Sequence, residues 1–284
     1  MLLKNYKTTF LNELSALYDE KEIESFFYLI LESFHRKKRI DLALEPEMEM
    51  DALQLLRWES ALAELKKHKP IQYILGETEF YGFPFLVDEN VLIPRPETEE
   101  LVALILEEEK GKREEGKVRI LDIGTGSGCI PIALKKNLPE AEVSAIDVSE
   151  KALALAMKNA ELNQVDVHFR LQDILATDDL ESSFDIIVSN PPYVRHLEKI
   201  EIQLNVLAYE PHLALFVADN DALLFYRKIA ALAQKHLTPN GKLYFEINQY
   251  LGKETVALVE SYGFTEVRLH QDIYGNDRMI SAVK

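Results

Sequence analysis

Four consecutive residues, Asn190-Pro191-Pro192-Tyr193, have the composition of a rigid polar pocket. They follow the apolar run Phe184–Ser189, which predicts a buried strand. The asparagine amide offers one carbonyl acceptor and one NH2 donor. The prolines fix φ and lack an N–H group, so the turn is stiff and nearby backbone carbonyls can point at a ligand. Tyr193 adds a flat aromatic face, so the stretch predicts hydrogen-bond acceptors beside an aromatic ring; the alternative is a purely structural turn.

A glycine-rich turn follows another predicted strand, in the sequence Asp122-Ile123-Gly124-Thr125-Gly126-Ser127-Gly128. Glycines let the backbone approach a ligand closely, and the helix that follows favours a negative group at its start. The spacing G-x-G-x-G differs from the dinucleotide fingerprint and from the phosphate-binding loop. The candidate binding residues are Gly124, Thr125, Gly126, Ser127 and Gly128. Taken alone, the stretch could be only a tight turn.

Acidic residues end the next two predicted strands. Asp147 lies about 20 residues beyond the glycines, where an acid can accept hydrogen bonds from ribose hydroxyls. It could instead cap the next helix, although Ser149 suits that role better. Asp173 could accept a hydrogen bond from an adenine amino group, and Ile174 could pack on the adenine ring. In open α/β sheets, ligands bind beyond the carboxyl ends of the strands, so four successive strand ends predict an adenosine-type ligand beside an amide-binding turn.

The segment from Val118 onward alternates strand and helix patterns, which predicts an α/β fold with a mostly parallel sheet and covering helices. The predicted strands are Val118–Ile123, Glu142–Asp147, Val165–Leu171, Phe184–Ser189, Lys242–Ile247, Phe264–His270 and Arg278–Val283. The predicted helices are Cys129–Asn137, Glu150–Leu162, Asp221–Leu237 and Lys253–Ser261. The last two strands are separated only by Gln271–Asp277, too short for a parallel crossover, so we expect them to be antiparallel.

Three segments make up the predicted domain organisation. Residues 1–70 show apolar residues at helical spacing, with Asp51 as a candidate helix cap, and predict a small helical bundle. Residues 71–96 hold aromatic and branched residues around Tyr81-Gly82, which predict a connecting β-hairpin. Residues 97–284 form the α/β domain, whose first helix begins near Pro96.

Bulk composition narrows the function classes. The chain has 284 residues, 47% of them hydrophobic, and a formal net charge of −16, which opposes tight non-specific binding to nucleic acid. No apolar run approaches the ~20 residues of a membrane span, and the N-terminus has no signal-peptide core, so we expect a cytoplasmic protein that does not contact membranes. The single cysteine, Cys129, is interpreted as a packed residue, and the seven histidines show no metal-ligand spacing, so no metal is predicted.

These motifs together resemble those of a known enzyme family. Asp122–Gly128 with Asp147 is similar to the S-adenosylmethionine site of class I methyltransferases. Asn190–Tyr193 resembles the motif of amino-methyltransferases that act on planar nitrogens, including adenine and the glutamine amide. The stretches Pro70–Gly76 and Val91–Glu99 resemble signatures of the HemK/PrmC protein-(glutamine-N5) methyltransferases. The chain departs from the family where glycines are usual, at Phe216–Asn220 and at Asn248.

The resemblance implies a class I S-adenosylmethionine-dependent methyltransferase fold, a Rossmann-like seven-stranded sheet with its last strand antiparallel, preceded by a substrate-docking helical bundle. It implies methyl transfer from S-adenosylmethionine to the glutamine amide nitrogen in the Gly-Gly-Gln motif of class 1 peptide chain release factors, in support of translation termination. It also implies that Asn190 and Pro191 accept the two amide N–H groups, that Tyr193 stacks on the amide plane, and that Pro192 stiffens the turn. Asn190 also borders the cofactor, and we expect a monomer.

Two alternatives remain open. An adenine-N6 DNA methyltransferase uses the same four-residue turn on a flipped base, but the acidic charge and the lack of a basic recognition domain count against it. A non-catalytic cofactor-binding interaction module is the other, and the intact Asn190 and Tyr193 count against that. Arg95 has two interpretations, a place near the cofactor or an ion pair that holds the connection between the domains, and we favour the structural one. Glu210 is interpreted as a residue that fixes a loop near the pocket.

Overall fold

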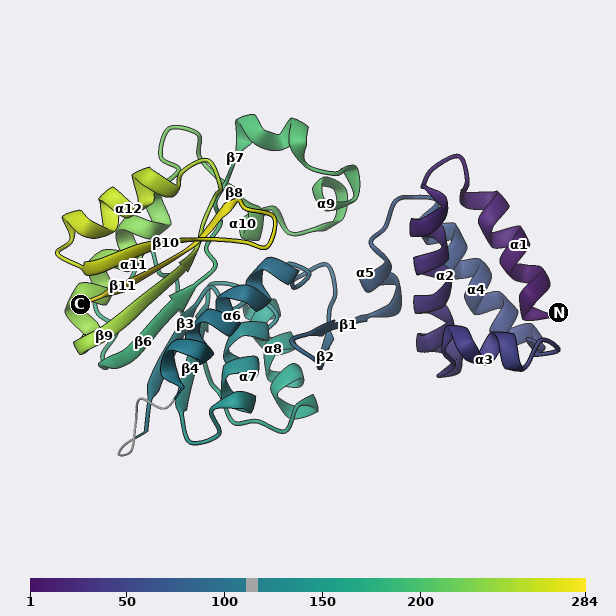
Figure 1. Cartoon of the computed structure of the whole chain (residues 1–284), viewed down its shortest axis with the longest axis horizontal. Helices are drawn as coiled ribbons and strands as arrows, with labels where there is room; N and C mark the ends of the chain where they lie inside the picture. Colours follow the sequence, from purple (N-terminus) through teal and green to yellow (C-terminus); the bar gives the residue numbers. More distant parts are fainter. Residues whose placement is uncertain (111–116) are drawn as a thin grey trace. The chain divides into compact units, whose positions relative to one another are not determined.

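The computed structural model describes residues 1–110 and 117–284 and divides the chain into two compact units (Figure 1). Unit 1 consists of Met1–Gly76 together with the short segment Gln203–Tyr209. Unit 2 consists of Glu77–Ile202 and Glu210–Lys284. Within the described residues, no helix is long and apolar enough to cross a membrane.

Unit 1 is helical, as residues 1–70 predicted. Its helices are α1 (Leu3–Leu14), α2 (Glu20–His35), α3 (Arg39–Leu44), α4 (Ala52–Leu65), α5 (Ile71–Leu75) and α9 (Leu204–Tyr209). The core gathers around Trp58, which is fully buried and meets Phe10 edge-on, with 5.9 Å between the ring centroids. Phe27 lies 4.8 Å from the same ring system, so aromatic contacts tie α1, α2 and α4 together.

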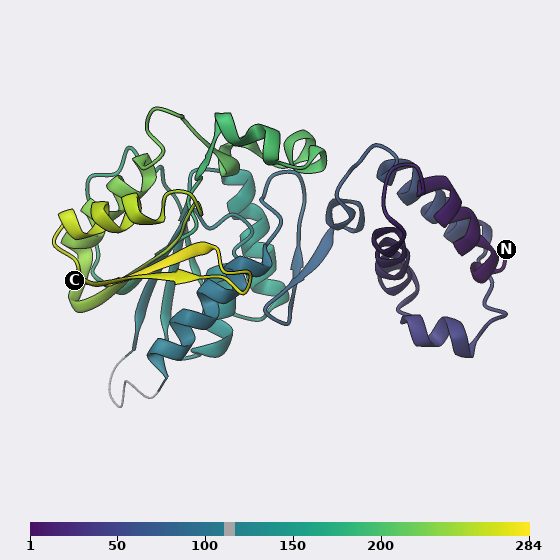
Figure 2. The same cartoon turned by 45° about the horizontal axis from the view of Figure 1, so that its top comes forward.

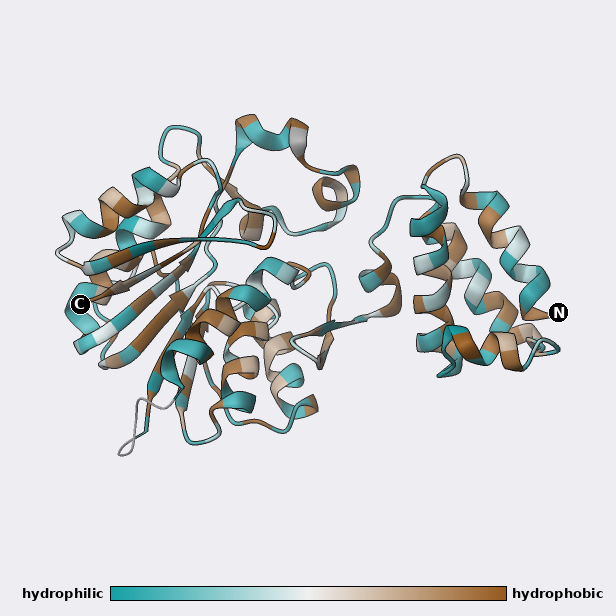
Figure 3. Ribbon diagram, viewed as in Figure 1, coloured by the Kyte–Doolittle hydropathy of each residue, from teal (hydrophilic) through white to brown (hydrophobic). Residues whose placement is uncertain are grey.

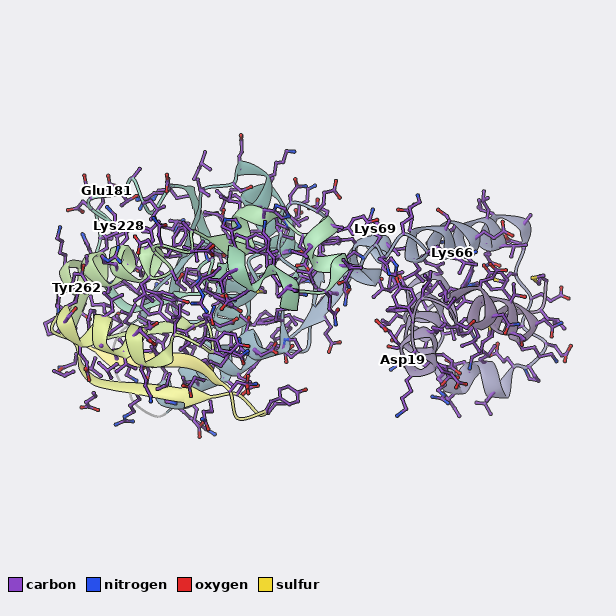
Figure 4. All side chains as sticks on the ribbon, turned by 90° about the horizontal axis from the view of Figure 1, so that it is seen from above. Asp19, Lys66, Lys69, Glu181, Lys228 and Tyr262 are labelled. Carbon is purple, nitrogen blue, oxygen red and sulfur yellow. The ribbon has the colours of Figure 1, made fainter. Side chains whose placement is uncertain are left out.

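Side-chain caps fix where these helices begin. The predicted cap Asp51 accepts a hydrogen bond from the Gln54 N–H at 2.8 Å, and the Gln54 side chain returns one to Asp51, which completes a capping box. Asp19 caps α2 by accepting a hydrogen bond from the Glu22 N–H, without a returning side-chain bond. Asp19 and Lys66, which follows the end of α4, both lie on the exposed surface of unit 1 (Figure 4).

The predicted hairpin connection over residues 71–96 is only partly correct. Residues 71–75 form helix α5, because Pro70 opens the turn and Gly76 ends it in the left-handed conformation with φ of 75°. The hairpin itself is β1 (Glu77–Phe80) and β2 (Phe83–Leu86). Tyr81 and Gly82 both have positive φ between these strands, as tight hairpin turns require. The division between the units falls after Gly76, inside the predicted connection.

Unit 2 contains the predicted seven-stranded sheet, with strand order β10-β11-β9-β6-β3-β4-β5. Its strands are β3 (Arg119–Ile123), β4 (Glu142–Asp147), β5 (His168–Leu171), β6 (Phe184–Ser189), β9 (Leu237–Glu246), β10 (Thr265–Gln271) and β11 (Asp277–Val283). The last strand, β11, is antiparallel to both neighbours, whereas β5, β4, β3, β6 and β9 run parallel. The predicted fold class is therefore confirmed.

Helices cover both faces of this sheet (Figure 2). One face packs against α6 (Pro96–Glu109), α7 (Cys129–Asn137) and α8 (Glu150–Leu162), and the other against α11 (Leu224–His236) and α12 (Gly252–Ser261). Adjacent residues of β6 serve opposite faces: Ile186 faces the first layer and Ile187 the second. Because both faces are buried, the central strands are apolar along most of their length (Figure 3).

The stretch between Val194 and Val217 has more structure than the sequence predicted. It contains β7 (Val194–Arg195), a 3-10 helix over His196–Glu201, helices α9 and α10 (His212–Leu215), and β8 (Phe216–Val217). Strands β7 and β8 pair in parallel, so the departure from the family pattern at Phe216 falls on a paired strand. Elements of two to six residues are too short to show a hydrophobic period, which is why the pattern missed them.

Candidate active site

A cavity opens at the carboxyl edge of the sheet in unit 2, where the predicted site residues meet. Its lining includes residues from the ends of four parallel strands, β3 to β6, and from the start of α6. The predicted residues in the lining are Gly124, Thr125, Gly126, Ser127, Asp147, Asp173, Ile174, Asn190, Pro191 and Pro192. Gly128 and Tyr193 do not line it, and each has a neighbouring role described below.

The glycine turn needs its glycines for two separate reasons. Gly124, Gly126 and Gly128 all have positive φ, which disfavours any residue with a side chain. At Gly128, a Cβ atom would also stand only 3.1 Å from the side chains of Ala156 and Ile132. Gly128 therefore lets α7 start close to α8, whereas Gly124 and Gly126 leave open space beside the cavity.

Asp147 is held by backbone donors on both carboxylate oxygens. Its Oδ2 accepts the Gly126 N–H at 2.8 Å, and its Oδ1 accepts the Ser149 N–H at 2.8 Å. Ser149 caps α8 by accepting the Ala152 N–H, so the cap that the sequence favoured is the one that forms. Each Asp147 oxygen keeps a further lone pair that can accept a hydroxyl from a ligand in the cavity.

Three polar side chains near the glycine turn have buried atoms with no partner among the described residues. They are Asp122 (both oxygens), Thr125 (the hydroxyl) and Gln172 (Oε1). Burial raises the pKa of Asp122 to about 7. The nearby Thr125 hydroxyl lowers this pKa in part, although its geometry does not meet that of a hydrogen bond. Buried polar atoms are nearly always paired, so this cluster suits a polar ligand that brings its own donors.

Asp173 and Ile174 follow β5 at the same edge. Asp173 is exposed, and its Oδ1 accepts the Leu175 N–H at 2.9 Å, which fixes the turn. Ile174 is buried and lines the cavity as an apolar contact surface. The pair presents one acid and one apolar side chain to the cavity, and the binding of an adenine ring by them stays a prediction.

A chain of hydrogen bonds runs beneath the Asn190–Tyr193 turn. The Asn190 Nδ2 group donates to Thr98 Oγ1 at 3.2 Å, and the Thr98 hydroxyl donates to Glu246 Oε2 at 2.6 Å. The Tyr193 hydroxyl donates to the other oxygen, Glu246 Oε1, at 3.1 Å. Sequence reasoning gave Thr98 and Glu246 no role. The available signal was Glu246 itself, an acid that directly follows the apolar residues Leu243–Phe245 at the end of β9, because a buried carboxylate needs partners.

Burial controls the ionisation of this chain. It raises the pKa of Glu246, and the hydrogen bonds from Thr98 and Tyr193 together with the charge of Arg278 oppose that rise. Burial and the nearby Glu246 raise the pKa of Tyr193 well above its ordinary range. Tyr193 therefore keeps its proton and remains a hydrogen-bond donor to Glu246.

Arg95, Glu210 and Cys129 have the structural roles that the sequence suggested. Arg95 Nη2 pairs with Glu210 Oε1 at 2.6 Å, and Glu210 Oε2 accepts the Ile93 N–H, so the buried Glu210 holds the segment before α6. Arg95 also lines the cavity. Burial raises the pKa of Cys129 to about 12, so it packs as a thiol and is not a nucleophile.

Asn248, which stands where the family usually has glycine, anchors the turn from the end of β9. Its Nδ2 donates to the Tyr193 carbonyl at 3.0 Å and to Glu198 Oε2 at 2.9 Å, and its Oδ1 accepts the Tyr250 N–H at 2.9 Å. We expect Asn248→Gly to lower the free energy of unfolding by about 1–3 kcal/mol, because buried partners lose their hydrogen bonds. Thermal denaturation checks this, and an unchanged melting temperature would contradict it.

Two family models and several known proteins match the sequence of this chain. Residues 8–76 match the family model of the PrmC N-terminal domain, and residues 101–212 match that of the methyltransferase small domain. A release factor glutamine methyltransferase of Flavobacterium psychrophilum is 65% identical over 280 residues, covering 99% of this chain and 98% of that protein. The chain belongs to the release factor glutamine methyltransferase family. A second member, from Bacteroides thetaiotaomicron, is 47% identical over 95% of each chain.

Solved structures agree with the fold of this family member. A methyltransferase from Pyrococcus furiosus superposes with a TM-score of 0.53 and 19% identity, covering 82% of this chain and 99% of that one. A 16S rRNA N2 G1207 methyltransferase of T. thermophilus, solved with AdoMet and guanosine, gives 0.51 at 21% identity, covering 73% of this chain and 49% of that one. At these identities the likeness concerns the fold alone.

As a methyltransferase of this family, the chain uses S-adenosylmethionine as its methyl donor. The cavity suits that molecule, which carries an ammonium group, ribose hydroxyls and an adenine amine as donors. The cavity lining in turn offers Gln172 Oε1, which has no hydrogen-bond partner among the described residues, and spare lone pairs on Asp147. The backbone of Gly124 and Gly126, with no side chain in the way, leaves room for close approach.

Proposed function

We propose that this chain transfers a methyl group from S-adenosylmethionine to the side-chain amide nitrogen of the glutamine in the Gly-Gly-Gln motif of class 1 peptide chain release factors. The observation that carries the proposal is the state of Asn190 at the cavity edge. Its Nδ2 is engaged by Thr98, so its Oδ1 stays available to accept a hydrogen bond from a substrate amide. Membership of the release factor glutamine methyltransferase family supports the same substrate.

The residues proposed to bind S-adenosylmethionine lie at three strand ends, and the residues at each end would contact a different part of the molecule. When bound, S-adenosylmethionine supplies an electrophilic methyl group on a sulfonium sulfur. Asp147 would accept the ribose hydroxyls, and Asp173 with Ile174 would bind the adenine. The glycine turn, Gly124 to Gly128, would cradle the amino-acid part; Asp122, just before the turn, is fully buried and does not line the cavity.

The proposed chemistry depends on positioning. An amide nitrogen is a poor nucleophile because its lone pair is delocalised, so holding it in line with the methyl group is the main contribution of the site. Asn190 Oδ1 and the Pro191 carbonyl would accept the two amide N–H groups and favour the positive charge that develops on nitrogen. Tyr193 does not line the cavity and its hydroxyl donates to Glu246, so its ring would have to turn toward the substrate to stack on the amide plane. Pro192 would keep the turn stiff. The proton can leave to solvent after the transfer, so the site needs no strong base.

A labelling competition tests the proposed substrate. The protein is incubated with radiolabelled S-adenosylmethionine and either a release factor that contains Gly-Gly-Gln or duplex DNA. We expect label on the release factor alone, because a net charge of −16 opposes binding to DNA. Label on DNA alone would overturn the assignment, and label on neither would favour a binding module. Since the proposed substrate is a translation factor, we propose that the protein acts in the cytoplasm. We propose separately that it acts as a monomer.

We propose further that residues 1–70, the bundle in unit 1, dock the release factor. The support is that this region matches a family-specific N-terminal model yet brings no residue to the cavity lining. Removing residues 1–70 should raise KM for the release factor about tenfold or more while leaving the affinity for S-adenosylmethionine within about threefold, on the scale of a lost 1.4 kcal/mol contact. Cofactor affinity shows that unit 2 still folds; an unchanged KM would refute the docking role.

A further inference from the structure

Three elements far apart in sequence meet at one buried carboxylate. Glu246 ends β9 and is 1% exposed, Thr98 lies in the first turn of α6 and is 3% exposed, and Asn190 follows β6. The contact between Thr98 and Glu246 spans 148 residues of sequence, and that between Asn190 and Thr98 spans 92. Such a contact is a product of the fold and not of local turn geometry.

The direction of each hydrogen bond follows from the number of protons available. A threonine hydroxyl has one proton, and the short 2.6 Å contact to Glu246 Oε2 takes it. Thr98 Oγ1 can then meet Asn190 only as an acceptor, so the Asn190 group that faces it must be the NH2 donor. The remaining half of the asparagine amide, Oδ1, is thereby turned away from Thr98.

We propose that Thr98 and Glu246 are positioning residues that set the orientation of the Asn190 amide, so that its oxygen and not its NH2 group faces the substrate glutamine. We call Glu246, Thr98 and Asn190 the orienting relay. The inference rests on the proposed function, because it explains how Asn190 Oδ1, one of the two acceptors proposed for the substrate amide, is kept facing the substrate. A flipped Asn190 would present a donor to the substrate N–H group that its oxygen would otherwise accept, and would repel it.

When Glu246 is ionised, it gives the orienting relay its direction. As a carboxylate it can only accept, and it takes the protons of both Thr98 and Tyr193. If Glu246 were protonated it could donate to Thr98, whose own proton would then point at Asn190 and favour the flipped amide. Protonation of Glu246 would also weaken the hydrogen bond that the Tyr193 hydroxyl donates to Glu246 Oε1.

Several groups surround Glu246 and affect its ionisation. Thr98, Tyr193 and the positive Arg278 favour the charged form, while burial and the negative Glu97 oppose it. Among the described residues, Cys129 on α7 and Tyr226 on α11 also interact electrostatically with Glu246. Because burial is the largest influence, the pKa of Glu246 lies above its ordinary value, and the acid limb of activity should lie higher than for an exposed glutamate.

Substitution of Thr98 tests the orienting relay. Thr98→Val keeps the shape and removes the hydroxyl; we expect kcat for release factor methylation to fall roughly 10- to 100-fold, with the Kd for S-adenosylmethionine unchanged. Thr98→Ser restores the hydroxyl and should recover most of kcat. The matched control is Thr255→Val on α12, a fully buried threonine outside the orienting relay whose hydroxyl bonds to the Leu251 carbonyl. Equal kcat in Thr98→Val and the parent protein would overturn the proposal, as would failure of Thr98→Ser to recover activity.

Substitution of Glu246 tests the direction of the relay through a pH profile. Glu246→Gln has one acceptor for two donors and cannot ionise, so we expect a lower kcat and the loss of one acid limb at saturating cofactor. Asp122 also titrates, so the readout is the difference between the parent and Glu246→Gln profiles. Identical limbs would contradict the role of the Glu246 charge. If the parent protein does not label a release factor at all, the proposed function fails, and that result is separate from any difference between the variants.

Discussion

Replacing Asn190 by alanine is expected to abolish most methyl transfer while leaving cofactor affinity within a few-fold of the parent protein. The alanine removes the acceptor that would hold the substrate amide, and loss of one such electrostatic contact costs roughly 10²- to 10³-fold in kcat. The substitution also removes the Asn190 NH2 group, which donates a hydrogen bond to Thr98 Oγ1 at 3.2 Å. Single-turnover rates with a labelled release factor measure the chemical step, and calorimetry measures cofactor binding.

A matched control separates this effect from damage to the fold. Asn137→Ala removes an asparagine whose amide bonds to the Ala133 carbonyl at the end of α7 and that does not line the cavity. We expect that variant to keep the parent rate. Full activity in Asn190→Ala would show that Asn190 does not hold the substrate amide. Equal losses in both variants would show that the assay reports stability.

Replacing Asp147 by alanine should act on cofactor binding instead of on the chemical step. Two backbone N–H groups, those of Gly126 and Ser149, donate to its carboxylate at 2.8 Å and hold it at the cavity edge. With hydrogen bonds to a charged group worth about 1.5–3 kcal/mol each, loss of the ribose contacts should raise the Kd for S-adenosylmethionine roughly 100-fold. At saturating cofactor, KM for the release factor should stay close to that of the parent.

Calorimetric titration with S-adenosylmethionine checks the Asp147 variant, and Asp166→Ala supplies the control. Asp166 is an exposed acid just before β5 that does not line the active-site cavity, and its replacement should leave the Kd unchanged. If Asp147→Ala bound the cofactor as tightly as the parent, the placement of the ribose at this strand end would be wrong.

The sequence predicted the catalytic fold well because its signals are local. The bounds of α7 and α8 agree with prediction at both ends, since Gly128 and Ser149 mark where these helices start. The central strands are apolar along most of their length, as sheets buried on both faces require. The residues at the strand ends then meet in the cavity, because parallel strands end at one edge of a sheet.

The remaining features depend on contacts that no local pattern encodes. Ile71 and Tyr73 have side chains common in strands, yet Pro70 and Gly76 bracket them in the helix α5. The roles of Thr98 and Glu246 follow from a contact across 148 residues, visible only once α6 and β9 are packed together. Asn248 likewise reaches Tyr193 and Glu198 through space, although its position next to a strand end hinted at the site.

The position of the transferred methyl group tests most directly whether the protein methylates the glutamine of the Gly-Gly-Gln motif. A release factor is methylated with the purified protein, digested, and sequenced by fragmentation mass spectrometry beside a copy whose Gly-Gly-Gln glutamine is replaced by alanine. The account predicts the added mass of one methyl group on that glutamine, resistant to mild base as an N-methyl amide is, and no methylation of the alanine copy. A methyl group on any other residue, or equal methylation of both copies, would contradict it.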